Sequence, residues 1–166
     1  MNNVFVVFLT IIICGIYASA QTKATALSIL TKSEPAVKWN AKSEIKGDFD
    51  YDGVADYALR GREGKFFVLG IVKGALSGKS KHYLVEFGED AGDQGALCSV
   101  NRAVITVENL DENYAKFAAD YLEKDSIKTL ESLSKKSKGI NIADGMCDSF
   151  HTLWDQKTNR FFWWRI

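Results

Sequence analysis

Residues 48–56 have the sequence DFDYDGVAD, and the rest of the chain is best understood outward from this stretch. Acidic side chains occupy its positions 1, 3, 5 and 9, and Gly53 occupies position 6, where the backbone can turn sharply. Alternate residues of an irregular loop can point inward together, and carboxylate oxygens at this spacing suit a hard cation such as Ca²⁺. The spacing therefore predicts a cation-binding loop. The alternative is an Asp-rich turn that binds no metal.

The spacing also assigns ligands within this loop. We expect Asp48, Asp50 and Asp52 to contribute carboxylate oxygens and Val54 to contribute its backbone carbonyl. Asp56 would close the site directly or through a water molecule. The expected cofactor is Ca²⁺.

The segments beside the loop predict strands. Residues 57–60 and 66–72 are rich in aromatic and β-branched side chains, and Leu59 stands where an EF-hand carries its bidentate Glu. Residues 47–59 instead resemble the calcium loop of FG-GAP and integrin-type propeller repeats. That resemblance implies a loop that joins two strands and holds Ca²⁺ through its Asp residues. The sequence contains one copy, so it does not imply a full propeller.

The first twenty residues predict a secretory signal peptide. Residues 4–14 are apolar, and Ala18, Ser19 and Ala20 form a small-residue cleavage site. The apolar run is shorter than the ~20 residues that a membrane-spanning helix needs, which disfavours the alternative of a membrane anchor. We expect cleavage after Ala20, a periplasmic or secreted location, and one calcium-binding, β-rich domain over residues 21–166.

The cysteines agree with export. Beyond the leader the chain has two of them, Cys98 and Cys147. An even number of cysteines in an oxidising compartment predicts a disulfide between the two, and two free buried thiols are the alternative.

The remaining patterns indicate an α+β fold, a β-rich antiparallel sheet with one or two helices. Helices are expected at 25–32 and 109–124, the second capped by Asn109 with Glu112, and residues 125–138 fit a further helix or a connector. Turns are expected at 61–64 and 157–159. Strands are expected up to residue 60, at 65–73, 81–87, within 96–107, and at 139–143, 149–155 and 160–166.

A second acidic segment is the candidate partner-binding site. Glu89, Asp90 and Asp93 lie in the glycine-rich loop 88–95. Exposed carboxylates on such a loop suit docking into a basic cleft of a partner protein. A second cation site, a pair of catalytic carboxylates and a merely solvated loop are the alternatives.

Two further features leave their alternatives open. His82 and His151 lie in predicted strands without zinc-ligand spacing, so a structural role is favoured over that of a general base. Residues 161–164 read FFWW, and successive strand residues face opposite sides. Either this strand is buried on both faces, or one aromatic pair is exposed to a protein or carbohydrate partner.

These observations favour an exported binding protein over an enzyme. Lysine and arginine number 21, as do aspartate and glutamate, so no strong field favours nucleic acid or an anionic membrane. Nucleophile-elbow, phosphate-loop and zinc signatures are missing from the sequence. In general character the chain resembles small periplasmic inhibitors and immunity proteins against cell-wall hydrolases. A carbohydrate- or cell-surface-binding module is the alternative, and a hydrolase using Glu89, Asp90 or His151 ranks last.

Overall fold

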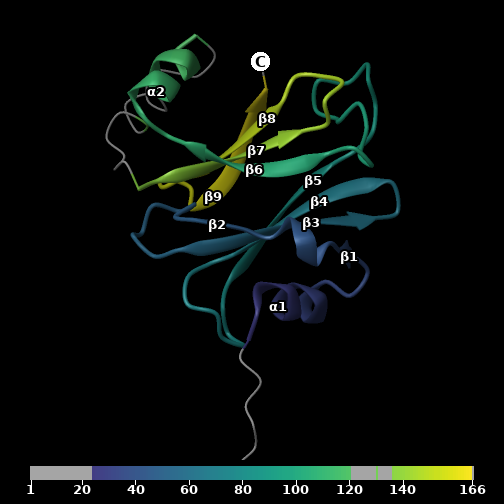
Figure 1. Ribbon diagram of the computed structural model, residues 1–166, viewed down its shortest axis with the longest axis vertical. Coiled ribbons are helices and arrows are strands. Elements are labelled where there is room, and N and C mark those ends of the chain that lie inside the picture. The colour runs from purple at the N-terminus through teal and green to yellow at the C-terminus, as the bar shows by residue number, and fades with distance from the viewer. Residues whose placement is uncertain (1–23, 121–129, 131–135, 166) are drawn as a thin grey trace, which may run out of the picture.

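The computed structural model describes residues 24–120, 130 and 136–165 (Figure 1). The proposed leader, 1–20, and most of the segment 121–135 lie outside the described residues. Within the described part of the chain, two antiparallel sheets and two α-helices confirm the expected β-rich fold. None of the described helices is long and apolar enough to span a membrane.

The first sheet contains the strands on both sides of the acidic loop. Its order is β1–β3–β4–β5, and β2 pairs with β3 farther along the same edge, beyond the short 3₁₀ helix η1 (Ala41–Ser43). All of these pairings are antiparallel. The strands are β1 (Lys38–Trp39), β2 (Ile45–Gly47), β3 (Asp56–Glu63), β4 (Phe66–Val72) and β5 (His82–Phe87).

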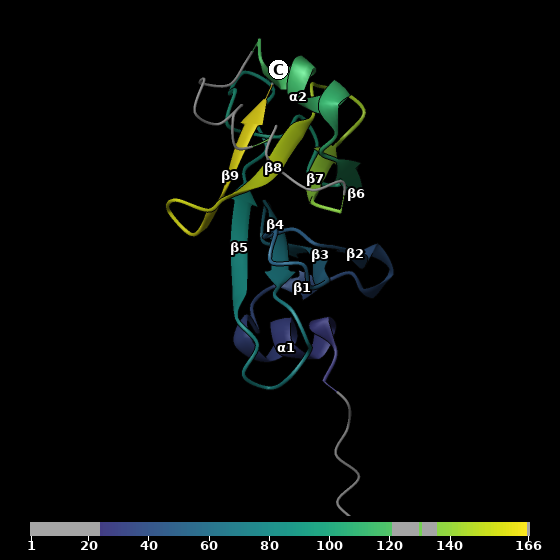
Figure 2. The ribbon, with the colours of Figure 1, turned by 90° about the vertical axis from the view of Figure 1, so that its left-hand side faces the viewer.

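The second sheet is a simple antiparallel meander, in which each strand pairs with the next along the chain. Its strands are β6 (Val104–Asn109), β7 (Lys138–Ala143), β8 (Phe150–Asp155) and β9 (Arg160–Arg165). Between β6 and β7 the chain forms α2 (Glu112–Ala118). Figures 1 and 2 show α1 beyond the first sheet and α2 beyond the second, so the helices lie at opposite ends of the molecule.

The main core lies between the two sheets. Strand β4 is buried on both faces, as its apolar sequence predicts: Phe67, Leu69 and Ile71 face the second sheet, while Val72 belongs to the cluster under α1. Alternating strand residues divide the side chains in this way. The side chains that complete the main core include Ile105, Ile140, Ile142 and Phe150 of the second sheet.

Helix α1 (Ala26–Ser33) covers the outer face of the first sheet. Its expected position is confirmed, and a capping box at Thr25 starts it. Trp39 lies between helix and sheet over Gly70, where a Cβ would stand 2.5 Å from the Trp39 ring. The absence of a side chain at Gly70 is therefore what admits the indole.

Several expected boundaries were wrong. Residues 61–63 continue β3, and the turn comes at Gly64, whose φ of 56° suits glycine. The strand expected within 96–107 is present as β6, which begins at Val104 and extends two residues beyond that range, to Asn109. Helix α2 is capped by Asp111, whose carboxylate accepts the N–H groups of residues 113 and 114, so the expected cap at Asn109 was wrong.

The aromatic strand β9 is covered on both faces. Phe161 packs toward the main core, and Phe162 and Trp164 pack against the cluster under α2. Trp163 contacts Phe87 and Phe150, with ring centroids 5.7 and 5.1 Å apart, but stays 40% exposed. Of the aromatic pair that was expected to be either buried or exposed to a partner, only the Trp163 indole is exposed, and only in part.

A disulfide joins Cys98 to Cys147, as the cysteine count predicts. Beside it, the Asp144 carboxylate accepts N–H groups from Ser99, Met146 and Cys147 at 2.8–3.0 Å. Burial acts to raise the pKa of Asp144, but the backbone hydrogen bonds outweigh it and hold the pKa below its usual value. The loops that carry the two cysteines are thus fixed by a carboxylate as well as by the covalent bond.

Candidate metal centre

The acidic loop links β2 to β3 and also ties the two sheets together. Phe49 is buried in the main core. The Tyr51 hydroxyl accepts the N–H of Trp154 on β8 at 3.2 Å, and the Lys138 N–H on β7 donates to the Asp48 carbonyl at 2.9 Å. The loop is therefore placed by tertiary contacts from both sheets, and its carboxylates lie at the junction.

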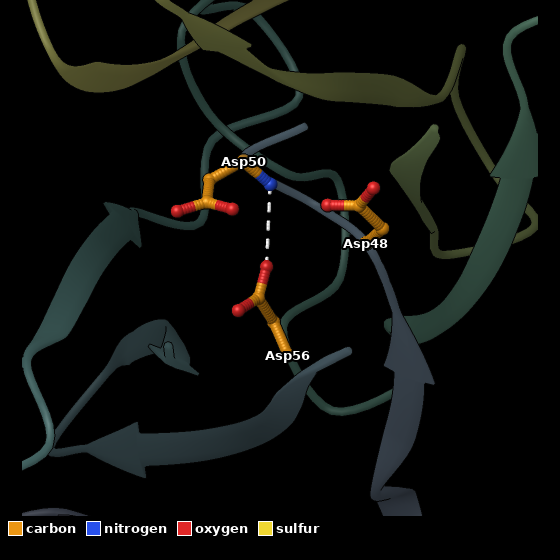
Figure 3. A group of neighbouring side chains, drawn as sticks. All are labelled: Asp48, Asp50 and Asp56. Carbon is orange, nitrogen blue, oxygen red and sulfur yellow. Dashed lines mark hydrogen bonds between the residues drawn. The ribbon is translucent and has the colours of Figure 1, made fainter. Parts of the chain in front are cut away.

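Three of the predicted ligands meet at this junction. One oxygen from each of Asp48, Asp50 and Asp56 lies within 4.8 Å of the others (Figure 3). Asp50 and Asp56 are buried, and Asp48 is half-buried. Among the described residues this is the only group of three or more His, Cys, Asp or Glu side chains with such geometry.

Asp56 organises the loop. Its Oδ2 accepts the N–H groups of Phe49 and Asp50 at 2.9 and 3.2 Å, and its Oδ1 accepts that of Gly74 at 2.7 Å. A carboxylate has about four acceptor sites, so three are in use and one remains. Asp56 can therefore join a cation, but its main role is to fix the backbone that positions the other two carboxylates.

Asp48 and Asp50 offer the more available oxygens. Asp48 Oδ2 accepts the Gly53 N–H at 3.1 Å, while its buried Oδ1 accepts no hydrogen bond within the described structure. Asp50 Oδ1 accepts the Asp52 N–H at 3.3 Å, and its Oδ2 forms an ion pair with Lys73. A buried carboxylate oxygen without a donor is a costly arrangement that a cation would relieve.

One of the predicted carboxylate ligands, Asp52, does not join this group. Its Oδ1 accepts the Val54 N–H at 2.8 Å. Val54 has an exposed side chain. Left-handed backbone at Tyr51 and Gly53, with φ of 64° and 85°, shapes the loop here. The loop tip therefore faces solvent, and of the four Asp side chains of the loop only those of Asp48, Asp50 and Asp56 converge.

Burial and mutual repulsion disfavour negative charge in this cluster. Burial raises the pKa of Asp56 to about 6, the amides of Gly74 and Phe49 oppose that rise, and the charges of Asp52 and Asp48 add to it. Burial likewise raises the pKa of Asp48. A positive charge placed among these groups would reverse the effect, since it favours the ionised carboxylates.

Lys73 supplies one such charge, and sequence reasoning missed it. It follows β4, pairs with Asp50, and places its ammonium 5.1 Å from the centre of the Trp154 ring. Burial, followed by repulsion from Lys81, lowers the pKa of Lys73. No motif marks this lysine, because only the pairing of β3 with β4 brings the end of β4 to the loop.

The acidic loop 88–95 lies elsewhere and is firmly held. Glu89 Oε2 accepts the Val100 N–H at 3.0 Å, and Asp90 and Asp93 each accept the N–H two residues ahead. Arg165 donates to the Ala96 carbonyl at 3.0 Å. All three acidic residues are exposed: Glu89 is tied to the backbone of Val100, and Asp90 and Asp93 are tied to the backbone of their own loop.

Both histidines have carboxylate partners that sequence spacing did not show. His82 Nε2 lies 3.0 Å from Glu34 Oε1. His151 is buried, its Nδ1 lies 2.8 Å from Glu108 Oε1, and its ring stacks on Trp164. Each pair joins elements distant in sequence. The partner of His151 is Glu108 and none of the three carboxylates of the loop 88–95.

Comparisons with protein-family models, curated proteins and solved structures found no match to this chain.

Proposed function

We propose that this chain is an exported, calcium-stabilised protein that binds another protein. The observation that carries the metal part is the convergence of Asp48, Asp50 and Asp56, with ligand oxygens within 4.8 Å. The donor-free oxygen of Asp48 adds support. All donors are oxygens, which is the set that Ca²⁺ prefers, and its remaining ligands would be carbonyls and water.

The ion would act as a structural bridge. The loop contacts both sheets through Phe49 and Tyr51, so a cation that fixes the loop also fixes the junction. Lys73 is the internal competitor, because its ammonium already neutralises Asp50. Calcium would displace it from that carboxylate.

Calcium binding is the first expected result. By analogy with extracellular calcium modules, calorimetry on chelator-treated protein should give a Kd of about 0.1–1 mM. About 10 mM Ca²⁺ should then raise the free energy of unfolding by about 1–3 kcal/mol, because the ligand binds only the native state. Lys73→Gln should tighten binding about tenfold by removing the competing charge.

The matched variants separate this idea from an ordinary salt effect. Asp50→Asn should abolish the response, and Asp148→Asn, an exposed carboxylate outside the cluster, should keep it. If neither the wild type nor Lys73→Gln binds calcium at millimolar concentration, the lysine is a permanent counter-ion and the metal proposal is wrong.

The protein-binding part of the proposal is supported by the loop 88–95. Asp90 and Asp93 are exposed and held by local hydrogen bonds, so little conformational freedom is lost when a partner docks. Gly95 lies beside the half-exposed Trp163. Fixed carboxylates next to an indole suit a basic, concave partner such as a cell-wall hydrolase.

Inhibition of such a hydrolase is the second expected result. A hydrolase recovered from periplasmic extract and purified should lose activity on addition of one equivalent of this protein. Asp90→Asn with Asp93→Asn should slow association at least about tenfold at low salt, since exposed charges act mainly on the association rate. Glu63→Gln with Asp148→Asn removes two exposed charges elsewhere and should leave the rate unchanged.

Other outcomes identify the alternatives. Saturable glycan binding that is lost in Trp163→Ala, together with no inhibition of any hydrolase, would favour a carbohydrate-binding module. Turnover on peptidoglycan that is lost in His151→Gln would favour an enzyme.

A further inference from the structure

A small basic pocket lies between the edge of the first sheet and the loop that precedes β6. Its volume is about 90 Å³. Arg60 and Arg62 of β3 and Lys38 of β1 line it, and Asn101 closes it from the loop. Buried Phe67 and Val100 form its apolar part. The pocket shares no residue with the metal centre, whereas its loop residues Val100 and Asn101 follow closely after the acidic loop 88–95, and Glu89 Oε2 accepts the Val100 N–H at 3.0 Å.

The strand register places like charges side by side. Lys38 and Arg62 are direct partners in the antiparallel pairing of β1 with β3. Arg60 lies two residues from Arg62 and therefore on the same face of the strand. Like charges directly opposite each other on neighbouring strands are destabilising. A third cation on the same face adds to that repulsion.

No ion pair of the described residues includes any of these three cations. The ion pairs are those of Lys73 with Asp50 and of the two histidines with glutamates. Arg60 donates to the Ala103 carbonyl, and Arg62 donates to the Gly64 carbonyl and to Asn101 Oδ1. Both guanidinium groups are thus held by neutral oxygens while further N–H donors remain.

The two asparagines of the pocket add donors. Asn40 Oδ1 accepts the Lys42 N–H at 3.1 Å, and Asn101 Oδ1 accepts from Arg62. One lone pair of each amide oxygen is therefore in use, and each NH₂ group offers two donors. The lining combines positive charge with spare donors, which is the character of an anion site.

We propose that this pocket binds an oxyanion head group, a carboxylate or a phosphate, through Arg60, Arg62 and Lys38. Planar guanidinium groups match both anions, because two parallel N–H donors meet two oxygens. The cavity is far smaller than the about 300–1,000 Å³ of sites for whole organic ligands, so it holds the head group alone. The rest of the ligand stays outside.

The test is titration with sodium phosphate and with sodium acetate at constant ionic strength, followed by backbone NMR and thermal unfolding. The amide signals of Gly61 and Asn101 should shift with saturation. Arg60→Gln and Arg62→Gln should each weaken binding by about ten- to a hundredfold, as expected for lost charged hydrogen bonds. Lys79→Gln, an exposed lysine of the β4–β5 connection, is the control and should bind as the wild type does. Whichever of the two anions binds more tightly identifies the source.

The like-charged pair of Lys38 and Arg62 allows a second measurement, whose expected result differs from that of a variant that simply folds less well. Without either anion, Lys38→Gln should melt at the same temperature as the wild type or higher, because repulsion is relieved. With saturating anion the order should reverse. Equal stabilisation of all variants by phosphate, or shifts that never saturate, would show an adventitious ion only and overturn the proposal.

Discussion

Replacing Cys98 and Cys147 together by alanine is expected to lower the free energy of unfolding by about 4 kcal/mol in the chain-entropy model of disulfides. The two cysteines are 49 residues apart, and the segment between them contains β6, α2 and β7. Without the bond this segment gains freedom in the unfolded state, while the native contacts stay in place. Urea denaturation followed by tryptophan fluorescence measures the difference.

Reduced wild-type protein is the matched control for this variant. If the bond acts through the unfolded chain, the reduced wild type and the double variant should unfold at the same urea concentration. Asp144 should keep both loops folded in either form, because its three backbone hydrogen bonds do not need the disulfide. Coincident unfolding curves for the oxidised wild type and the double variant would contradict the assigned role of the bond.

Asp56→Asn is expected to destabilise the calcium-free protein by about 2–4 kcal/mol, as for a buried residue whose removal leaves backbone donors unpaired. Asp56 is fully buried and accepts three N–H groups with its two oxygens. Asparagine has one acceptor oxygen, so its NH₂ group must face at least one backbone N–H. Chemical denaturation in chelator measures this effect apart from any bound metal.

Two further variants serve as controls for the effect of Asp56→Asn on stability. Asp148→Asn, at an exposed position, should change stability by no more than about 0.5 kcal/mol. Asp50→Asn should lose the calcium response with a smaller loss of metal-free stability, since Asp50 makes fewer backbone hydrogen bonds. An unfolding curve for Asp56→Asn that matches the wild type would refute its role as organiser of the loop.

Much of the fold could be predicted because local patterns agree with it. Strand β4 is a continuous apolar run, and α1 begins at its capping residue, so each element carries its own signal. Errors came where a tertiary contact outweighs the local pattern. Residues 61–63 look like a turn but pair with β1 and β4, and Asp111 caps α2 although Asn109 fits the same rule.

The candidate sites also contain some residues that the sequence could predict and others that it could not. The Asp spacing predicted a cluster of carboxylates in this loop, and Asp48, Asp50 and Asp56 form one, although Asp52 does not join it. Lys73 beside Asp50, Glu108 beside His151, and Lys38 opposite Arg62 could not be predicted, since each pair joins separate elements. Charged side chains carry no periodic signal that names a distant partner.

By itself, the sequence determined the acidic loop, the two cysteines that pair and the β-rich class of the fold. Each of these follows from the spacing of neighbouring residues or from the number of residues of one type. Only the tertiary structure decided which carboxylates converge, which cation faces them, and that three basic side chains share one pocket. The physical reason is register: antiparallel pairing sets which side chains of distant strands lie together. The charges that meet across those strands, rather than the motif alone, define what this molecule can bind.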